Sequence, residues 1–260
     1  MRAKPIPISY ARRAVIDLMH FTKTVPAGIG ARRMVLQPLF QARSEIALRP
    51  SWPAIFGKAL AVVARDLPEL RRAYVTIPWP HLCEFPVSVG LFVIEREVEG
   101  EPVPLGLLIK DPAAMSILDI AANIRFAATA PVREIKHFNR VLQISRLPLP
   151  IRRLAWWIGL NWSRQRAHHF GTFAVSSVAG LGMRLPTILT PLTFALTYDA
   201  IEADGTMEVR LVFDHRVVDG AQVARFLVNL EQTLNGVVLQ ELQAMARQPG
   251  RPSAATSVRH

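Results

Sequence analysis

The sequence predicts a layered α/β domain of the α+β kind, in which helices flank a mixed β-sheet. Helical and strand-like hydrophobic patterns are interleaved along the chain, and hairpin turn signals occur late in it. Half of the 260 residues are hydrophobic, which is enough to bury a large core. No internal repeat or low-complexity linker divides the chain. We therefore expect one domain over residues 1–246.

The first half of the chain supplies three helical patterns and two strand patterns. Helices are predicted at 9–23, 52–66 and 115–127, and strands at 85–94 and 103–109. Ser9 is placed to cap the first helix, and Pro68 follows the end of the second. The second helix is apolar on most sides, so we expect it to be buried.

The second half alternates strands with turns before a final helix. Strands are predicted at 171–180, 193–201 and 206–215, the last of them after an Ala-Asp-Gly hairpin turn. An amphipathic helix is predicted at 221–236, ended by Asn235-Gly236. Residues 247–260 are rich in Pro, Ser, Ala and Arg and lack a core pattern, so a disordered tail is predicted there.

The charge balance favours anionic partners. Lys and Arg number 31 against 20 Asp and Glu, a net charge of +11. Phosphorylated cofactors, nucleic acid, acidic protein faces and anionic lipid all fit this charge. The arginines are spread along the chain and no nucleic-acid-binding motif is present, so nucleic acid is not expected as a partner.

Cysteine content and hydropathy bear on the compartment. Cys83 is the only cysteine, so no intrachain disulfide can form, which suits a reducing compartment. No apolar run approaches the ~18 residues that span a bilayer, and no signal peptide is visible. The sequence therefore predicts a cytoplasmic protein, with peripheral contact to a membrane left open.

One short stretch, "VFDHRVVDGAQ" at 212–222, carries a candidate chemical group. His215 follows a predicted strand, and Asp219-Gly220 forms a turn before the next helix. A histidine at a strand end faces open space, and its ordinary pKa near 6.5 suits proton transfer. Gly220 would allow a sharp turn. By itself the pattern leaves both a catalytic base and a packed turn histidine open.

A family resemblance extends this motif to most of the chain. The string "DHRVVDGAQVARFL" resembles the signature of the acyltransferase core subunit of 2-oxoacid dehydrogenase complexes, a family that shares its fold and His-x-x-x-Asp-Gly motif with chloramphenicol acetyltransferase. Four further segments are similar to that family in the same order, so that the resemblance covers roughly residues 8–240. They lie at 11–26, 57–70, 104–124 and 171–182.

The resemblance implies a role for each matching residue. His215 corresponds to the general base and Ser176 to the serine that stabilises the tetrahedral oxyanion. Asp219 corresponds to an acid that pairs with an arginine of the opening helix, which here is expected to be Arg12, although Arg13 competes. Gly220 corresponds to the turn glycine. Ser177 would face away from Ser176 and serve the structure.

The same resemblance implies the reaction and the assembly. It implies an acyltransferase that moves an acyl group other than aminoacyl from a coenzyme A thioester by direct transfer. No metal is expected, since no Cys/His ligand cluster is present. The family forms trimers or multiples of trimers, with His215 of one subunit facing Ser176 of its neighbour. The sequence does not indicate which residues bind coenzyme A.

Departures from the family leave alternatives open. The chain begins at the core, so it is expected to carry no lipoyl group of its own, and a lipoylated or carrier protein would act in trans. A dehydrogenase-complex core fed in this way is one alternative, and a non-enzymatic trimeric scaffold or lipid-binding module is another. The loop "VAGLGMRLPT" at 178–187 is altered from the family pattern. Segment 147–169 mixes tryptophans with arginines, which predicts either internal packing or contact with a membrane surface or acyl chain. Its two histidines, His168 and His169, are expected in a surface loop.

Overall fold

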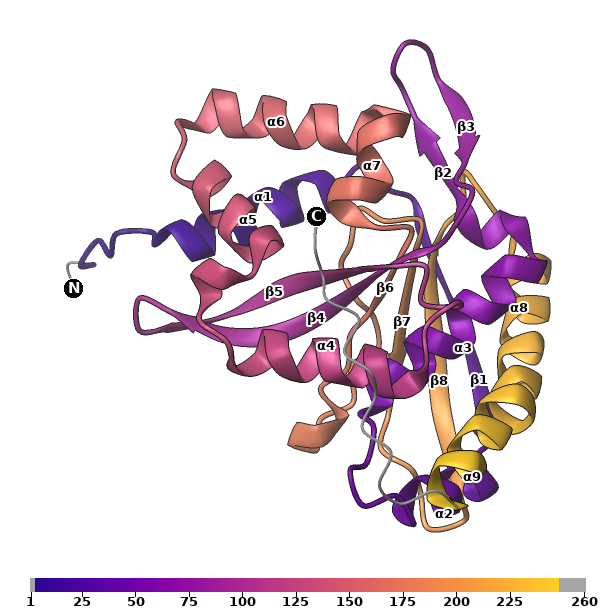
Figure 1. Cartoon of the computed structure of the whole chain (residues 1–260). Coiled ribbons are helices and arrows are strands. Elements are labelled where there is room, and N and C mark those ends of the chain that lie inside the picture. The colour runs from indigo at the N-terminus through magenta and orange to yellow at the C-terminus, as the bar shows by residue number, and fades with distance from the viewer. Residues whose placement is uncertain (1–2, 248–260) are drawn as a thin grey trace.

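The computed structural model describes residues 3–247 and contains a six-stranded mixed sheet flanked by helices (Figure 1). The sheet order is β1-β8-β7-β6-β4-β5, and β6 runs parallel to both of its neighbours while the other pairs are antiparallel. The strands are β1 Ala27–Val35, β4 Val89–Val98, β5 Glu101–Lys110, β6 Phe173–Val175, β7 Phe194–Tyr198 and β8 Thr206–Asp214. A separate hairpin pairs β2 Arg72–Val75 with β3 His81–Glu84. The predicted mixed sheet is confirmed.

All four predicted helices are present, together with others that were not predicted. They are α1 Tyr10–Thr22, α2 Gln37–Ser44, α3 Trp52–Asp66, α4 Ile117–Thr129, α5 Lys136–Ser145, α6 Leu149–Asn161, α7 Ser163–Phe170, α8 Gly220–Thr233 and α9 Leu239–Arg247. Ser9 caps α1 as predicted, because its side chain accepts a hydrogen bond from the Arg12 amide. No helix within residues 3–247 is both long and apolar enough to cross a bilayer.

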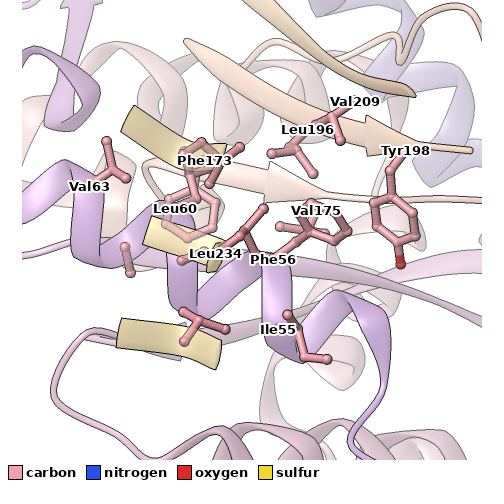
Figure 2. Packing of buried hydrophobic residues seen from close by; sticks show 14 of the residues in the cluster. Ile55, Phe56, Leu60, Val63, Phe173, Val175, Leu196, Tyr198, Val209 and Leu234 are labelled. Atoms are coloured by element: carbon pink, nitrogen blue, oxygen red, sulfur yellow. The ribbon is translucent and has the colours of Figure 1, made fainter. Parts of the chain in front are cut away.

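The main core lies between one face of the sheet and helices α3, α4 and α8 (Figure 1). In Figure 2, side chains of α3 pack against inward-facing residues of β6, β7 and β8. The Phe56 ring stacks on the Tyr198 ring with centroids 4.4 Å apart. Ile55, Phe56 and Leu60 are almost completely buried, which confirms the predicted buried helix. This layer fixes the strands that end at the candidate site.

Two predicted boundaries were wrong, and a third was confirmed. The strand predicted at 85–94 starts at Val89, and the one predicted at 171–180 is reduced to Phe173–Val175. Asn235-Gly236 interrupts the last helix as predicted, because α8 ends at Thr233 and Gly236 has non-helical backbone angles (φ −101°, ψ −107°). The chain kinks there before it continues into α9, and the buried Leu234 and Val238 hold the kinked segment in the core. The predicted tail lies outside the described residues, apart from Arg247 at the end of α9.

Helices α1, α5, α6 and α7 form a second group. This group and α3 lie on opposite sides of β5 and β6 (Figure 1). The fully buried Asp17 of α1 joins this group together, because its two carboxylate oxygens each lie 2.7 Å from an arginine Nε of α6, in Arg152 and Arg153. Beside this ionic contact, Phe21 and Trp156 stack with their ring planes 6° apart. The ionic contact and the aromatic pair attach α6 to the opening helix.

Candidate active site

His215 is held firmly at the end of β8. Its backbone N–H donates to the carbonyl of Pro26 (3.0 Å), and the preceding Asp214 N–H donates to Thr193 (2.9 Å). The Asp214 carboxylate, fully buried, accepts hydrogen bonds from the Arg216 guanidinium at 2.7–3.2 Å. Meanwhile the His215 side chain is 52% exposed. A fixed backbone therefore presents an accessible imidazole, as expected for a histidine at a strand end.

The Asp214–Arg216 ion pair was missed by sequence reasoning. Arg216 also places its guanidinium 4.5 Å from the centre of the Tyr74 ring, on the β2–β3 hairpin. The sequence signal that could have indicated this pair is the order "DHR", in which an acid and a base flank the histidine. The pair ties the end of β8 to the hairpin.

Asp219 is the N-cap residue of α8 and lies next to His215. Its carboxylate Oδ1 is 3.6 Å from His215 Nδ1, and its backbone N–H donates to Gln222 Oε1 (3.0 Å). The side chain is 80% exposed. This position leaves His215 Nε2 as the ring nitrogen on the side away from the carboxylate.

The expected Arg12–Asp219 pair is not formed within the chain. Arg12 instead binds Glu101 at the start of β5, with Nε 2.6 Å from Oε1, and Ser9 donates a hydrogen bond to the same carboxylate. The hydrogen bond from Ser9, followed by that from Arg12, lowers the pKa of Glu101. Since α1 packs along β5, its first turn lies beside Glu101. The competing Arg13 lies over the Tyr10 ring.

The predicted reason for Gly220 was also wrong. Its φ lies outside the left-handed region, so the turn does not require glycine for its backbone. A Cβ at Gly220 would meet no atom of the described residues within 4 Å. The described part of the chain therefore shows no steric need for glycine at this position.

Ser176 and Ser177 follow β6 and have different surroundings. The Ser177 hydroxyl donates to the Tyr198 carbonyl (2.7 Å) and accepts from the Ala179 N–H (3.1 Å), in line with its expected structural role. Ser176 is anchored through its backbone N–H, which donates to Leu196 (3.0 Å). Its hydroxyl has no hydrogen-bond partner among residues 3–247 and remains available as a donor.

A buried ion pair between Arg210 of β8 and Asp199, which directly follows β7, lies level with Ser176 and was also missed. Arg210 binds the Asp199 carboxylate through two contacts of 2.9 Å, and Glu208 lies 2.5 Å from the same guanidinium. The hydrogen bonds that Arg210 donates to Asp199 raise the pKa of Arg210. Because both acids neutralise Arg210, it is not a free cation for an oxyanion.

His215 and Ser176 do not meet within one chain. In the sheet register, Ser176 is level with Thr197 and Arg210, whereas His215 lies five residues beyond Arg210 on β8. At about 3.4 Å per residue this is an offset of about 17 Å along the strands, with two strand spacings across them. The two side chains lie toward opposite ends of the sheet.

Segment 147–169 packs through one face and exposes the other. Trp156 is buried between Phe21 and Phe170, and the buried Arg166 donates to the carbonyls of Leu160 and Pro191. Burial lowers the pKa of Arg166 to about 10. These contacts confirm the packing interpretation for the inner face.

The outer face of α6 is apolar and exposed, and contact of this face with a membrane stays a prediction. Its large exposed side chains are Leu149, Ile151, Leu154 and Trp157. His168 and His169 were expected in a loop but belong to helix α7. Among residues 3–247, no cluster of three or more His, Cys, Asp or Glu side chains is arranged to hold a metal ion.

Comparison with known proteins identifies the fold. Residues 171–241 match the family model of the 2-oxoacid dehydrogenases acyltransferase (catalytic domain). A probable dihydrolipoamide acetyltransferase from Listeria monocytogenes superimposes with a TM-score of 0.63 at 19% identity, over 90% of this chain and 95% of that one. The predicted family resemblance is confirmed.

Two further structures of this acyltransferase fold agree. The dihydrolipoamide acetyltransferase of Azotobacter vinelandii has a TM-score of 0.65 at 17% identity and covers 91% of this chain and 93% of that one. A chloramphenicol acetyltransferase has a TM-score of 0.50 at 14% identity, over 89% and 99% of the two chains. No curated protein sequence matches this chain.

The matched segment contains the main candidate residues. Ser176, His215 and Asp219 all lie within 171–241, the part that matches an acyltransferase catalytic domain, whereas Arg12 lies outside it. The study of the A. vinelandii enzyme concerns a serine, a histidine and an asparagine four positions after that histidine. This chain has Asp219 at that spacing from His215, a charged group in place of an amide.

Proposed function

We propose that this chain transfers an acyl group between a coenzyme A thioester and an acceptor, with both bound at once. The observation that carries the proposal is the combination of a firmly held, accessible His215 with a free Ser176 hydroxyl, inside the segment that matches an acyltransferase catalytic domain. The net charge of +11 suits the phosphates of coenzyme A.

Two side chains supply the chemistry of this transfer. His215 Nε2 takes the proton from the acceptor's thiol, hydroxyl or amine as that group attacks the thioester carbonyl. Ser176 donates a hydrogen bond to the oxygen that becomes negative in the tetrahedral intermediate. When the intermediate collapses, the carbon–sulfur bond breaks, and the departing thiolate of coenzyme A takes the proton from the imidazolium. Asp219, on the Nδ1 side, orients the ring and stabilises its charged form.

The sheet register favours a site shared between subunits. His215 and Ser176 are displaced along the strands in one chain, so a single reacting carbonyl can contact both only if they come from different copies. A closed ring of three copies would place each His215 against the Ser176 of the next copy. We therefore propose a homotrimer, or an assembly of trimers, as the active form.

Thiol release from a panel of acyl-coenzyme A thioesters tests the proposed reaction. We expect at least one chain length to support turnover that depends on His215. A parallel series uses an acyl-lipoylated domain as donor, because a dehydrogenase-complex core would be fed in this way. Turnover with the lipoylated donor alone would favour that alternative. If no donor supports His215-dependent turnover, the enzyme proposal is wrong and the scaffold alternative gains support.

Mixing two inactive variants tests the shared site. We expect Ser176→Ala to lower kcat by about 10²–10³-fold through loss of one oxyanion donor, and His215→Ala to lower it by about 10²–10⁴-fold through loss of the base. When the two are unfolded and refolded together in equal amounts, about one quarter of the interfaces in a cyclic trimer join an intact histidine to an intact serine. Activity should return to about that fraction of the wild type.

In the matched control, Ser177→Ala takes the place of Ser176→Ala, because the Ser177 hydroxyl donates a hydrogen bond to a backbone carbonyl. Activity of the refolded mixtures is compared at equal trimer concentration, measured by size-exclusion chromatography with light scattering. A mixture of His215→Ala and Ser176→Ala that stays as inactive as each variant alone would contradict a site built across subunits.

A further inference from the structure

A cavity lies between α5, α6 and α7, in the group of helices that includes the segment departing from the family. Its volume is about 380 Å³, within the range of small-ligand sites. The walls are mainly apolar and include Ile144, Trp156 and Phe170. Polar groups line only one part of it, where His137 and Arg140 of α5 meet His169 of α7. The cavity therefore combines an apolar interior with a basic edge.

The basic edge has no acidic counterpart. Arg140 Nη1 lies 2.9 Å from His169 Nδ1 and 3.5 Å from His168 Nε2, and it has no carboxylate partner among residues 3–247. A guanidinium can only donate, so His169 Nδ1 must accept and its proton must lie on Nε2. The sequence contains no Asp or Glu between Glu134 and Asp199. Asp17, the acid that α1 brings to this group of helices, is already bound to two arginines of α6.

Burial and neighbouring positive charge both disfavour the charged forms of the two histidines at this edge. Burial, followed by the charges of His169 and Arg140, lowers the pKa of His137 to about 4. Burial and then the Arg140 charge also lower the pKa of His169. Near neutral pH both rings are therefore uncharged, and Arg140 is the fixed cation of the edge. A bound anion would supply the charge that this edge lacks.

We propose that this cavity binds a single-chain amphiphile with a carboxylate head, such as a medium-chain fatty acid. Its alkyl chain lies against Trp156 and Phe170, and its carboxylate accepts hydrogen bonds from Arg140 and from the Nε2–H of His169. This site is separate from the one formed by His215 and Ser176 and goes beyond the proposed acyl transfer. The ligand chemistry follows from the apolar interior and the unpaired guanidinium.

Titration calorimetry of the full chain with decanoate tests the proposal. We expect one decanoate per chain, with weaker binding of decanol, which has no charge, and no binding of acetate, which has no chain. Arg140→Gln should weaken decanoate binding by about 10- to 100-fold, the effect of losing one charge-assisted hydrogen bond. Ala155→Phe, which fills the cavity wall, should abolish it.

Arg164→Gln is the matched control, since Arg164 is an exposed arginine of α7 that does not line the cavity. It should leave decanoate binding unchanged, as should His215→Ala, which separates this site from the acyl-transfer site. Thermal unfolding checks that each variant is folded. Because Arg140 is exposed, Arg140→Gln still tests the proposal if Ala155→Phe fails to fold. The proposal is overturned if decanoate does not bind, if both arginine variants weaken it equally, or if decyl phosphate binds more tightly than decanoate.

Discussion

His215→Ala is expected to lower kcat for acyl transfer by about 10²–10⁴-fold, the contribution of a positioned general base. The imidazole is half exposed, and its ring centroid lies 5.1 Å from that of the buried Phe213, while the backbone on either side is held by Pro26, Thr193 and the Asp214–Arg216 pair. We therefore expect little change in the thermal midpoint and none in the proposed trimer. Steady-state kinetics with the best donor of the acyl-coenzyme A panel measure the effect.

The matched control for this variant is His168→Ala. His168 is exposed on α7, where its Nε2 lies 3.5 Å from Arg140 Nη1, and it has no proposed role in the transfer. Its kcat should match that of the wild type. If His215→Ala retains wild-type kcat with a donor that is turned over, His215 is not the base, and the assignment made from the motif fails.

Asp17→Asn is expected to lower the free energy of unfolding by about 3–5 kcal/mol, the effect of removing one partner from a buried ionic contact. The carboxylate is fully buried and lies 2.7 Å from each of Arg152 and Arg153. An uncharged amide would leave two arginines, both largely buried, without a counter-charge. Chemical denaturation followed by far-UV circular dichroism measures the loss.

Two companion variants separate this mechanism from a general effect of charge. Asp66→Asn removes an exposed acid whose contact with Arg65 is 3.9 Å long, and it should change the stability by less than about 1 kcal/mol. The triple variant Asp17→Leu, Arg152→Met and Arg153→Met removes the whole charged group. It should recover most of the loss, because apolar residues can replace a buried ionic group. Equal destabilisation by Asp17→Asn and Asp66→Asn would contradict this account.

Local signals predicted four helices, α1, α3, α4 and α8, but not α2, α5, α6, α7 or α9. Long-range pairing determined what these signals did not reveal. The bounds of α3 follow from an apolar run between Pro53 in its first turn and Pro68 just beyond its end, and the backbone restriction of each proline is local. Strand β1 was missed because "AGIGARRMV" has little strand character. Its glycines are explained only by the fold, since a Cβ at Gly28 would lie 2.4 Å from the Phe213 ring and one at Gly30 2.6 Å from Val223.

The candidate site shows the same division. The position of His215 could be predicted because the strand, the turn and the helix that surround it are adjacent in sequence. The partner of Arg12 could not, since Glu101 is brought beside α1 only when β5 forms. A charged side chain in an isolated sequence has many candidate partners, and tertiary packing decides among them. The cavity beside α6 could not be predicted from the sequence for the same reason, because packing brings its lining residues together.

The stacking of Arg216 on Tyr74 couples the β2–β3 hairpin to the end of β8 that carries His215. A two-stranded ribbon is only marginally stable alone. Here two arginines hold the hairpin at Tyr74. Arg216 lies over the Tyr74 ring, and the buried Arg166 donates a hydrogen bond to the Tyr74 carbonyl. Proteolytic cleavage at the tip of the hairpin, or a ligand that displaces the hairpin, would weaken the Arg216–Tyr74 contact. The Asp214–Arg216 pair beside the His215 imidazole would then be held less firmly. Acyl transfer should then fall even though no reacting group has been touched.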